Sequence, residues 1–318
     1  MTLAVRTRAL LAGLVGIAAM TGIPAFAAAD TSTPDDAVAA DRTVNVWQWN
    51  VAGWKLHHGS TTDGLIPAAT SSITNRDTDF VAVNELCRGQ YDALIDGLTE
   101  AGWPTDPDNF ARFESYNDTA CDGEPFGIAI LSRRALGAAD RVALPADNGN
   151  ERHQLLCAAS EPIAARLCTT HITPSNDVID GEKINETQLN YVNDRVEDYY
   201  RAGESVIIAG DFNAQPNYGR LNGWYSSRLD TGNNPDNTGH YRELDDDDAA
   251  NCPGYGENTV AEADPPGPCG PGKKIDLIFV RDDRLSGDYD SDSLSISAQC
   301  GGPCSDHRII IGTATVSG

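Results

Sequence analysis

The strongest constraint on the fold is a short apolar run that ends in a carboxylate and an amide. The stretch Ser205–Asn213 reads Ser-Val-Ile-Ile-Ala-Gly-Asp-Phe-Asn. Its four consecutive apolar residues, Val206–Ala209, are typical of a strand that is buried on both faces. Gly210 is expected to let the backbone turn, and Asp211 and Asn213 should then point to the same side. Strand ends of this kind bind ligands in α/β folds, although an ordinary β-turn uses the same residue types.

Further predicted strands alternate with a few helices along the rest of the chain. Strands are predicted at 43–50, 79–85, 127–131, 154–158, 165–172, 275–280 and 308–316. An apolar spacing of three to four residues predicts helices at 67–75, 90–101 and 182–201. Residues 214–272, rich in Gly, Pro, Asn and Asp, should form a long irregular region of the kind that carries function or binds ions. Because no repeat or linker separates two cores, we expect one domain, a sandwich of two sheets with helices outside.

The first 29 residues have the features of a cleaved export signal. Two arginines precede an apolar stretch at 9–20, and Ala-Phe-Ala at 25–27 matches a small-residue cleavage pattern. The apolar stretch is shorter than the roughly 20 residues that a membrane-spanning helix needs, and no later stretch reaches that length. Residues 30–42 should form a flexible leader, and residues 43–318 the single folded domain. We therefore expect a secreted protein without stable membrane insertion.

The eight cysteines indicate disulfide bonds, because an exported chain meets an oxidising environment. None of their spacings matches a zinc motif. Four pairings are favoured by their positions: Cys157–Cys168 across adjacent strands, Cys252–Cys269 around a Pro/Gly loop, Cys300–Cys304 in a tight turn, and Cys87–Cys121. Eight cysteines allow many connectivities, so the sequence leaves the pattern open.

The composition argues against binding of polyanions by bulk charge. The chain has 23 Lys and Arg against 47 Asp and Glu, a formal net charge of −24. Any phosphate chemistry must therefore depend on a local site with metal ions and a few arginines. Since no basic cluster suited to a nucleic-acid groove occurs, affinity for nucleic acid should be modest and metal-dependent.

Polar side chains recur at the ends of the predicted strands. They are Asn50, Glu85, His171, Asp211 with Asn213, Asp276, and Asp306 with His307. Each alone has an ordinary explanation, such as a solvated acid, a satisfied sheet histidine or a turn, but their recurrence favours a shared site. Carboxylates with an amide and few imidazoles form a hard, oxygen-rich site suited to Mg²⁺, with Ca²⁺ or Mn²⁺ as alternatives.

Asp276 is the most informative of these residues. It lies at the start of a predicted buried strand, where a carboxylate is costly unless it is paired. His307 is the leading candidate partner, because a histidine bonded to a carboxylate through one nitrogen can present the other as a base. A neighbouring lysine, Lys273 or Lys274, is the alternative partner. A divalent cation, a His–Asp pair and a second histidine are the groups that phosphodiester hydrolysis requires.

These motifs resemble those of the endonuclease/exonuclease/phosphatase superfamily, and within it the deoxyribonuclease I-like enzymes. Gly-Asp-Phe-Asn at 210–213, Ile-Asp-Leu-Ile-Phe at 275–279 and Ser-Asp-His at 305–307 occur in the family's order and spacing. The segments 171–176 and 218–229 are also similar, and the resemblance runs from residue 44 to about residue 316. It implies an α+β fold, a four-layer α/β/β/α sandwich of two mixed β-sheets flanked by helices.

The resemblance implies a metal site built from three of the recurring residues. Glu85 would bind the catalytic divalent metal, with Asn50 close to it and Asp306 completing the acidic cluster. Position 84 departs from the family, since Asn84-Glu85 stands where Gln-Glu is usual.

The resemblance also implies the catalytic and phosphate-binding roles. His307 would be the base, oriented by Asp276. His171 would be a second catalytic histidine that bonds the phosphate or serves the leaving oxygen. Asp211 and Asn213 would position the attacked phosphate and the water.

Two further features concern charge. Arg152, just ahead of the strand at 154–158, is similar to the family's phosphate-binding arginine. The loop at 230–272 is unusually long and acidic, and its run Asp245–Asp248 is expected to be a solvated charge run, with a structural Ca²⁺ site as the alternative.

The favoured function is a metal-dependent phosphodiesterase, an endonuclease that cuts DNA without strong sequence preference and acts as a monomer. One alternative keeps the fold and changes the substrate, giving a sphingomyelinase-like phospholipase C or a phosphomonoesterase. A lipid enzyme should have an exposed apolar hairpin, and the region around Trp224 and Tyr225 is too polar for that. A second alternative is a non-catalytic or toxin-subunit binding protein, against which the intact set of polar residues argues.

Overall fold

The computed structural model describes residues 41–104, 106–248, 252–261 and 266–317. The predicted export signal and nearly all of the predicted leader lie outside the described residues. The chain divides into two units, and residues 38–318 form the folded unit described below. Its first strand begins at Arg42, the last residue of the predicted leader.

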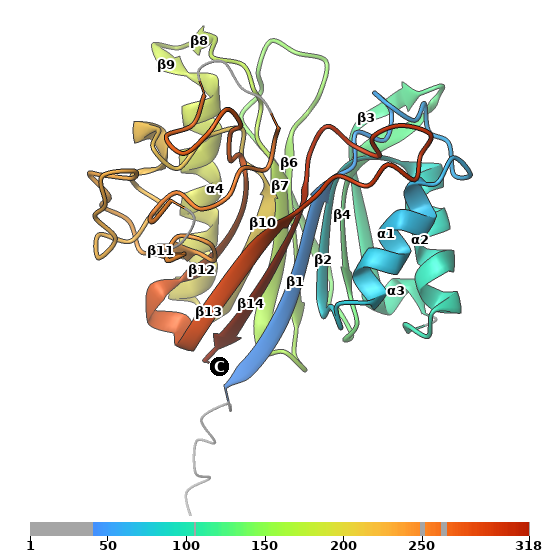
Figure 1. The fold of residues 1–318 in the computed structure, drawn as a ribbon, viewed down its shortest axis with the longest axis horizontal. Helices are drawn as coiled ribbons and strands as arrows, with labels where there is room; N and C mark the ends of the chain where they lie inside the picture. The colour runs from blue at the N-terminus through green and yellow to red at the C-terminus, as the bar shows by residue number, and fades with distance from the viewer. Residues whose placement is uncertain (1–40, 105, 249–251, 262–265, 318) are drawn as a thin grey trace, which may run out of the picture. The chain divides into compact units, whose positions relative to one another are not determined.

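One sheet has six strands in the spatial order β13-β14-β1-β2-β4-β3 (Figure 1). They are β1 Arg42–Asn50, β2 Phe80–Cys87, β3 Ala111–Cys121, β4 Glu124–Ser132, β13 Leu285–Leu294 and β14 Ile309–Val316. β1 is parallel to β2, and the other neighbouring pairs are antiparallel. The sheet is therefore mixed.

The second sheet also has six strands, in the order β11-β12-β10-β7-β6-β5. They are β5 Ala139–Ala143, β6 Gln154–Ser160, β7 Ala165–His171, β10 Ser205–Asp211, β11 Tyr241–Glu243 and β12 Asp276–Arg281. Only β7 and β10 are parallel. A small separate hairpin pairs β8 Val178–Ile179 with β9 Glu182–Lys183.

Helices cover the outer face of each sheet (Figure 1). The helix α1 Leu65–Thr74 and the helix α2 Arg88–Glu100 share an apolar cluster with the first sheet. The longest helix, α4 Ile184–Arg201, shares one with the second sheet. Three short elements, α3 Pro107–Phe110, η1 Gly219–Leu221 and η2 Asp282–Arg284, complete the fold.

The inner faces of the two sheets share one apolar core. Val46 and Ile130 from the first sheet meet Ile207 and Ile278 from the second. The next residue after Ile207, Ile208, faces α4 instead, because successive side chains of a strand point to opposite faces. Both faces of β10 are therefore buried, as its apolar run predicts, and the fold is the expected four-layer α/β/β/α sandwich.

Gly210 does not produce the expected turn, because β10 continues through Asp211. A Cβ atom at position 210 would lie 2.1 Å from the carbonyl oxygen of Thr170 on the neighbouring strand β7. Glycine is needed for this close approach of two backbones. The interpretation of Gly210 as a turn residue was therefore wrong.

All eight cysteines form the four predicted pairs. The prediction that the acidic run is solvated is wrong for Asp245 and Asp246, which are only 2% and 1% exposed. Asp245 accepts a hydrogen bond from Lys274, and Asp246 accepts bonds from Arg242. Two of the four acids are thus buried because each has a cationic partner. In the described ranges, no helix is both long and apolar enough to cross a membrane.

Candidate active site

The candidate site lies where the carboxyl ends of both parallel strand pairs meet. β1 ends at Asn50 beside Asn84 of β2, and β7 ends at His171 beside Asp211 of β10. Asp276, the first residue of β12, pairs with Asp211 from the other side. A pocket of about 430 Å³ opens here. Its lining includes the predicted residues Glu85, His171, Asp211, Asn213, Asp306 and His307.

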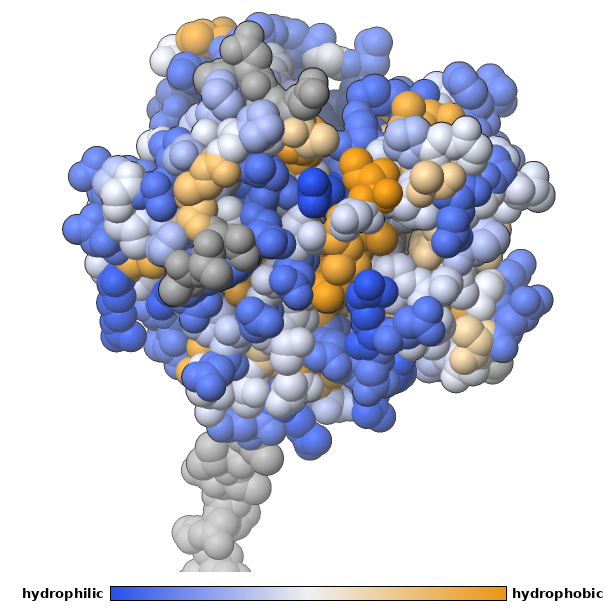
Figure 2. Space-filling view, viewed as in Figure 1, coloured by the Kyte–Doolittle hydropathy of each residue, from blue (hydrophilic) through white to orange (hydrophobic). Residues whose placement is uncertain are grey.

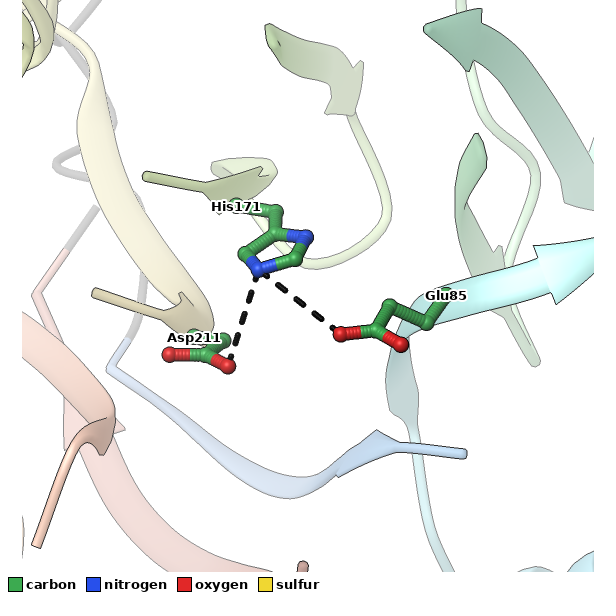
Figure 3. A group of neighbouring side chains, drawn as sticks. All are labelled: Glu85, His171 and Asp211. Atoms are coloured by element: carbon green, nitrogen blue, oxygen red, sulfur yellow. Dashed lines mark ion pairs between the residues drawn. The ribbon is translucent and has the colours of Figure 1, made fainter. Parts of the chain in front are cut away.

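Glu85 reaches the pocket from a distorted part of β2. The pairing of β2 with β4 shifts register between Val83 and Leu86, and Glu85 has φ 58°. A left-handed backbone is uncommon for a glutamate, and such strain concentrates at functional sites. The bulge turns the Glu85 side chain toward His171 and Asp211 (Figure 3).

Asp211 lies between the two histidines. Its Oδ2 is 3.7 Å from Nε2 of His171 and 3.8 Å from Nε2 of His307. The same oxygen accepts a hydrogen bond from Nδ2 of Asn50 at 3.1 Å. Burial and then the charge of Asp276 raise the pKa of Asp211. Figure 3 shows Asp211 and Glu85 on either side of the His171 ring, whose Nε2 is 3.9 Å from the Glu85 carboxylate.

His307 is bonded to Asp276, as predicted. Its Nδ1 is 2.8 Å from Oδ2 of Asp276, a carboxylate with no exposed surface. Burial alone would lower the pKa of His307, but the charge of Asp276, the hydrogen bond to it and the charge of Asp211 outweigh burial and raise the pKa to about 10. The carboxylate of Asp276 thus favours the protonated form of this imidazole.

The loop that carries His307 is fastened to the end of β1. The hydroxyl of Ser305 donates to the carbonyl of Asn50 at 2.7 Å and accepts a bond from the backbone N–H of His307. The indole of Trp49 donates to the carbonyl of His307 at 3.0 Å. The position of His307 is thus fixed by the same strand that ends in Asn50.

The two amides of the predicted site hold other groups in place. Nδ2 of Asn50 donates to Oε1 of Glu85 at 2.8 Å and to Asp211, while its Oδ1 accepts from the N–H of Ala52. Asn50 in this orientation positions the acids Glu85 and Asp211. Asn213 has φ 47°, and its Nδ2 donates to the carbonyl of Ile172, which fixes it beside the pocket.

The remaining two predicted residues lie at or beyond the rim. Asp306 is bonded to Lys55 at 2.6 Å; burial would raise its pKa, but this bond and the charge of His307 lower it. Arg152 has a side chain that is 70% exposed and paired with Asp118, and it does not line the pocket. The structure therefore brings together every predicted site residue except Arg152.

Several pocket residues were missed by the sequence analysis. Trp54, Lys55, Phe126 and Glu151 line the pocket, and burial raises the pKa of Glu151. None of them stands in a motif, so the sequence held no signal for them. Their placement depends on which loops and strand residues the two sheets bring to one edge.

The acidic residues fit a divalent cation. Ligand atoms of Glu85, His171 and Asp211 all lie within 4.8 Å of one another, and so do those of Asp211, Asp276 and His307. In the second group, Nδ1 of His307 and Oδ2 of Asp276 are bonded to each other, whereas all three residues of the first group line the pocket. Two carboxylates and one imidazole suit Mg²⁺ or Mn²⁺.

Solved structures with the same fold are found at low sequence identity, and no curated protein matches the chain by sequence. The human Nocturnin catalytic domain with bound sulfate anion has a TM-score of 0.61 at 15% identity, covering 86% of this chain and 94% of that one. Truncated Caenorhabditis elegans TDP2 has a TM-score of 0.57 at 15% identity, covering 86% and 98%. D. rerio TDP2 complexed with single strand DNA product has a TM-score of 0.54 at 15% identity, covering 86% and 99%.

The model of the Endonuclease/Exonuclease/phosphatase family matches residues 47–307, most of the described fold. Members of this family are hydrolases that act on phosphodiester bonds, and they generally use a divalent metal. The matched range includes all the predicted site residues, from Asn50 to His307. The chain belongs to the endonuclease/exonuclease/phosphatase family.

Proposed function

We propose that the protein is a secreted, divalent-metal-dependent endonuclease that hydrolyses DNA phosphodiester bonds. The observation that carries this proposal is the position of Asp211 between the Nε2 atoms of His171 and His307 in one pocket. Two imidazoles that both approach one carboxylate oxygen can serve the attacking and leaving oxygens of a displacement at phosphorus. We further propose Mg²⁺ as the cation and the monomer as the active form.

Three residues of the chain would have separate roles in hydrolysis. His307, bonded to Asp276 through Nδ1, presents Nε2 to the pocket, where it can take the proton of the attacking water. His171 lies across Asp211 and would hold a phosphate oxygen or protonate the leaving oxygen. Asn213, fixed at the pocket wall, would orient the phosphate.

A divalent cation, when bound, would supply positive charge that neutralises the phosphate and polarises it for attack. Glu85 with Asp211 would hold it, and Asp306 would contribute to the same acidic cluster. Positive charge beside these carboxylates also opposes a proton on His307, whose pKa of about 10 would otherwise keep it in the acid form. The base function of His307 is therefore expected to depend on the cation.

DNA is favoured as the substrate by one structural neighbour and by the surface. D. rerio TDP2 has been solved with a single-stranded DNA product. Figure 2 shows a mainly hydrophilic face with only a few apolar side chains gathered near its centre, which does not suit insertion into lipid. The net charge of −24 means that affinity for DNA must depend on the local site and the cation.

Export is supported by the amino-terminal segment and by the four disulfide bonds. Disulfides of this number are typical of chains that fold in an oxidising compartment. They are also compatible with an extracellular nuclease, which meets DNA outside the cell.

The test is a plasmid-nicking assay on the purified mature protein with Mg²⁺, Mn²⁺, Ca²⁺ or EDTA. Sphingomyelin and a panel of phosphomonoesters are assayed beside it. His171→Ala and His307→Ala should each lower nicking by orders of magnitude, whereas the exposed His240→Ala, outside the site, should not. Folding is checked by circular dichroism for all three variants.

Nicking that EDTA abolishes supports the nuclease proposal. An intact plasmid with turnover of sphingomyelin or a phosphomonoester would keep the site and replace the substrate. Absence of turnover on every substrate would overturn the enzymatic proposal in favour of a binding protein.

A further inference from the structure

A buried glutamine of the first sheet, Gln48, is hydrogen-bonded to Asp276 of the second sheet, the carboxylate that holds His307. Gln48 lies on β1 two residues before Asn50 and has no exposed surface. Its Nε2 donates to Oδ1 of Asp276 at 3.1 Å and to Oδ1 of Asn84 at 3.2 Å. Because Asp276 belongs to the second sheet, this amide spans the interface between the sheets.

The orientation of the Gln48 amide is fixed by its two acceptors. Asn84 cannot present its nitrogen instead, because its Nδ2 donates to the carbonyl of Thr170 and its Oδ1 accepts from the backbone N–H of Asp211. A rotated Gln48 amide would place its oxygen against the Asp276 carboxylate and the Asn84 oxygen. Only the observed orientation puts a donor in front of both oxygens.

In this orientation no donor in the described part of the chain reaches the side-chain oxygen of Gln48. This oxygen, Oε1, is buried. A buried unpaired oxygen is unfavourable, so a glutamine at this position is explained by its two donor contacts and not by its carbonyl.

The two carboxylate oxygens of Asp276 have different partners. Oδ2 is bonded to Nδ1 of His307, and Oδ1 accepts from Gln48. Without a donor at Oδ1 the buried carboxylate would lose half of its side-chain partners and could rotate away from the imidazole. The angle at which Asp276 meets His307 therefore depends on Gln48.

We propose that Gln48 is a positioning residue that orients Asp276, and through it His307, for hydrolysis. This inference rests on the proposed function, in which His307 is the base. The hydrogen bonds continue from Gln48 through Asn84 to the backbone of Asp211, so one buried amide pair contacts both Asp276 and Asp211.

A double-mutant cycle tests the proposal. Gln48→Met removes both donors at similar length, Asp276→Asn removes the charged partner, and the double variant combines them. We expect Gln48→Met to lower kcat by about 10- to 100-fold with KM nearly unchanged, which is less than the roughly 100- to 10,000-fold contribution of a complete general base. In the Asp276→Asn background the same change should have an effect of less than about 3-fold, because contacting residues are not additive.

The matched control is Val46→Ala. Val46 lies on the same strand two residues before Gln48, faces the same core and makes no polar contact with the site. It should lower the melting temperature without lowering kcat. A loss of kcat in Val46→Ala as large as that in Gln48→Met would overturn the proposal. So would independent effects of Gln48→Met and Asp276→Asn in the double variant.

A measurement without substrate separates this inference from the proposed function. At constant pH, the proton that His307 Nδ1 shares with Asp276 is followed by proton NMR and assigned by its loss in His307→Gln. Gln48→Met should shift this resonance or broaden it by exchange, whereas Val46→Ala should leave it in place. An unchanged resonance in Gln48→Met overturns the role of Gln48, whether or not the wild-type protein hydrolyses DNA.

Discussion

The phenol oxygen of Tyr116 lies 3.3 Å from Nδ1 of His171, so the two histidines of the site have partners of different charge. His307 is held by the carboxylate of Asp276, whereas His171 is held by a fully buried tyrosine. Burial raises the pKa of Tyr116 well above its ordinary value, so the phenol stays neutral. The two histidines thus have different surroundings: a carboxylate contacts Nδ1 of His307, and a neutral phenol contacts Nδ1 of His171.

Tyr116→Phe should reduce hydrolysis moderately. The change removes the contact to Nδ1 of His171 and keeps the ring that packs between Phe126 and His153. The loss of one neutral hydrogen bond is worth about 1 kcal/mol, which corresponds to about a 5-fold fall in kcat. Steady-state kinetics on plasmid or oligonucleotide would measure it, with the partly exposed Tyr191→Phe on α4 as the control. An unchanged kcat in a folded Tyr116→Phe protein would show that this contact does not orient His171.

Lys274→Met should destabilise the fold strongly. Nζ of Lys274 lies 2.7 Å from Asp245 and 3.2 Å from Glu243, and all three side chains are buried. Burial alone would lower the pKa of Lys274, but these two carboxylates outweigh it and raise the pKa. Removing the ammonium group of Lys274 leaves the two buried carboxylates without a cationic partner, which costs about 3–5 kcal/mol of unfolding free energy.

Urea unfolding of Lys274→Met beside Lys273→Met measures this cost. The neighbouring lysine is partly exposed, so its replacement should change the free energy of unfolding by less than about 0.5 kcal/mol. Similar unfolding midpoints for the two variants would contradict the role assigned to the buried ion pairs.

The sequence predicted the interior of the fold better than its edges. Every strand that lies between two neighbours was predicted, because a strand covered on both sides requires apolar residues that recur in the sequence. The four strands of the two large sheets that were missed, β3, β5, β11 and β13, are the four edges of those sheets, and the short hairpin strands β8 and β9 were missed as well. Edge strands carry polar residues such as the alternating aspartates of β13, and their pattern resembles that of a loop.

The same contrast holds for the site. Residues at the ends of buried strands were predictable, because the sheet itself brings those ends together. Gln48 and Tyr116 were not, since a side chain inside a strand gives no sign of which atom it faces across the sheet interface. Arg152 was predicted from a short motif, and the structure places it on the surface beside Asp118.

Removal of a disulfide should cost more stability when the bond closes a longer loop, as two of the four bonds can show. Cys87–Cys121 closes 34 residues and Cys300–Cys304 only 4. In the chain-entropy model the double serine variants should lose about 4 and about 2 kcal/mol of unfolding free energy. Both pairs flank the site, since Cys87 follows Glu85 and Cys304 precedes Asp306, so Mg²⁺ affinity of each folded variant is measured as well. Equal losses of stability would show that loop length does not set the contribution of these bonds.

His153 should make the folded state sensitive to mild acid. Burial, and then the charge of His171, lower the pKa of His153 from 6.5 to about 4. Between these values the unfolded chain binds a proton at His153 that the folded chain does not bind. The contribution of His153 to the free energy of unfolding is therefore fully present above about pH 6.5 and is lost as the pH drops toward 4. The shift corresponds to about 3 kcal/mol.

Urea unfolding at pH 7 and pH 4.5 measures this effect. The free energy of unfolding should fall less between these pH values in His153→Gln than in the wild type. The exposed His240→Gln should lose as much as the wild type, and an equal loss in all three proteins would exclude His153 as the acid-sensitive group.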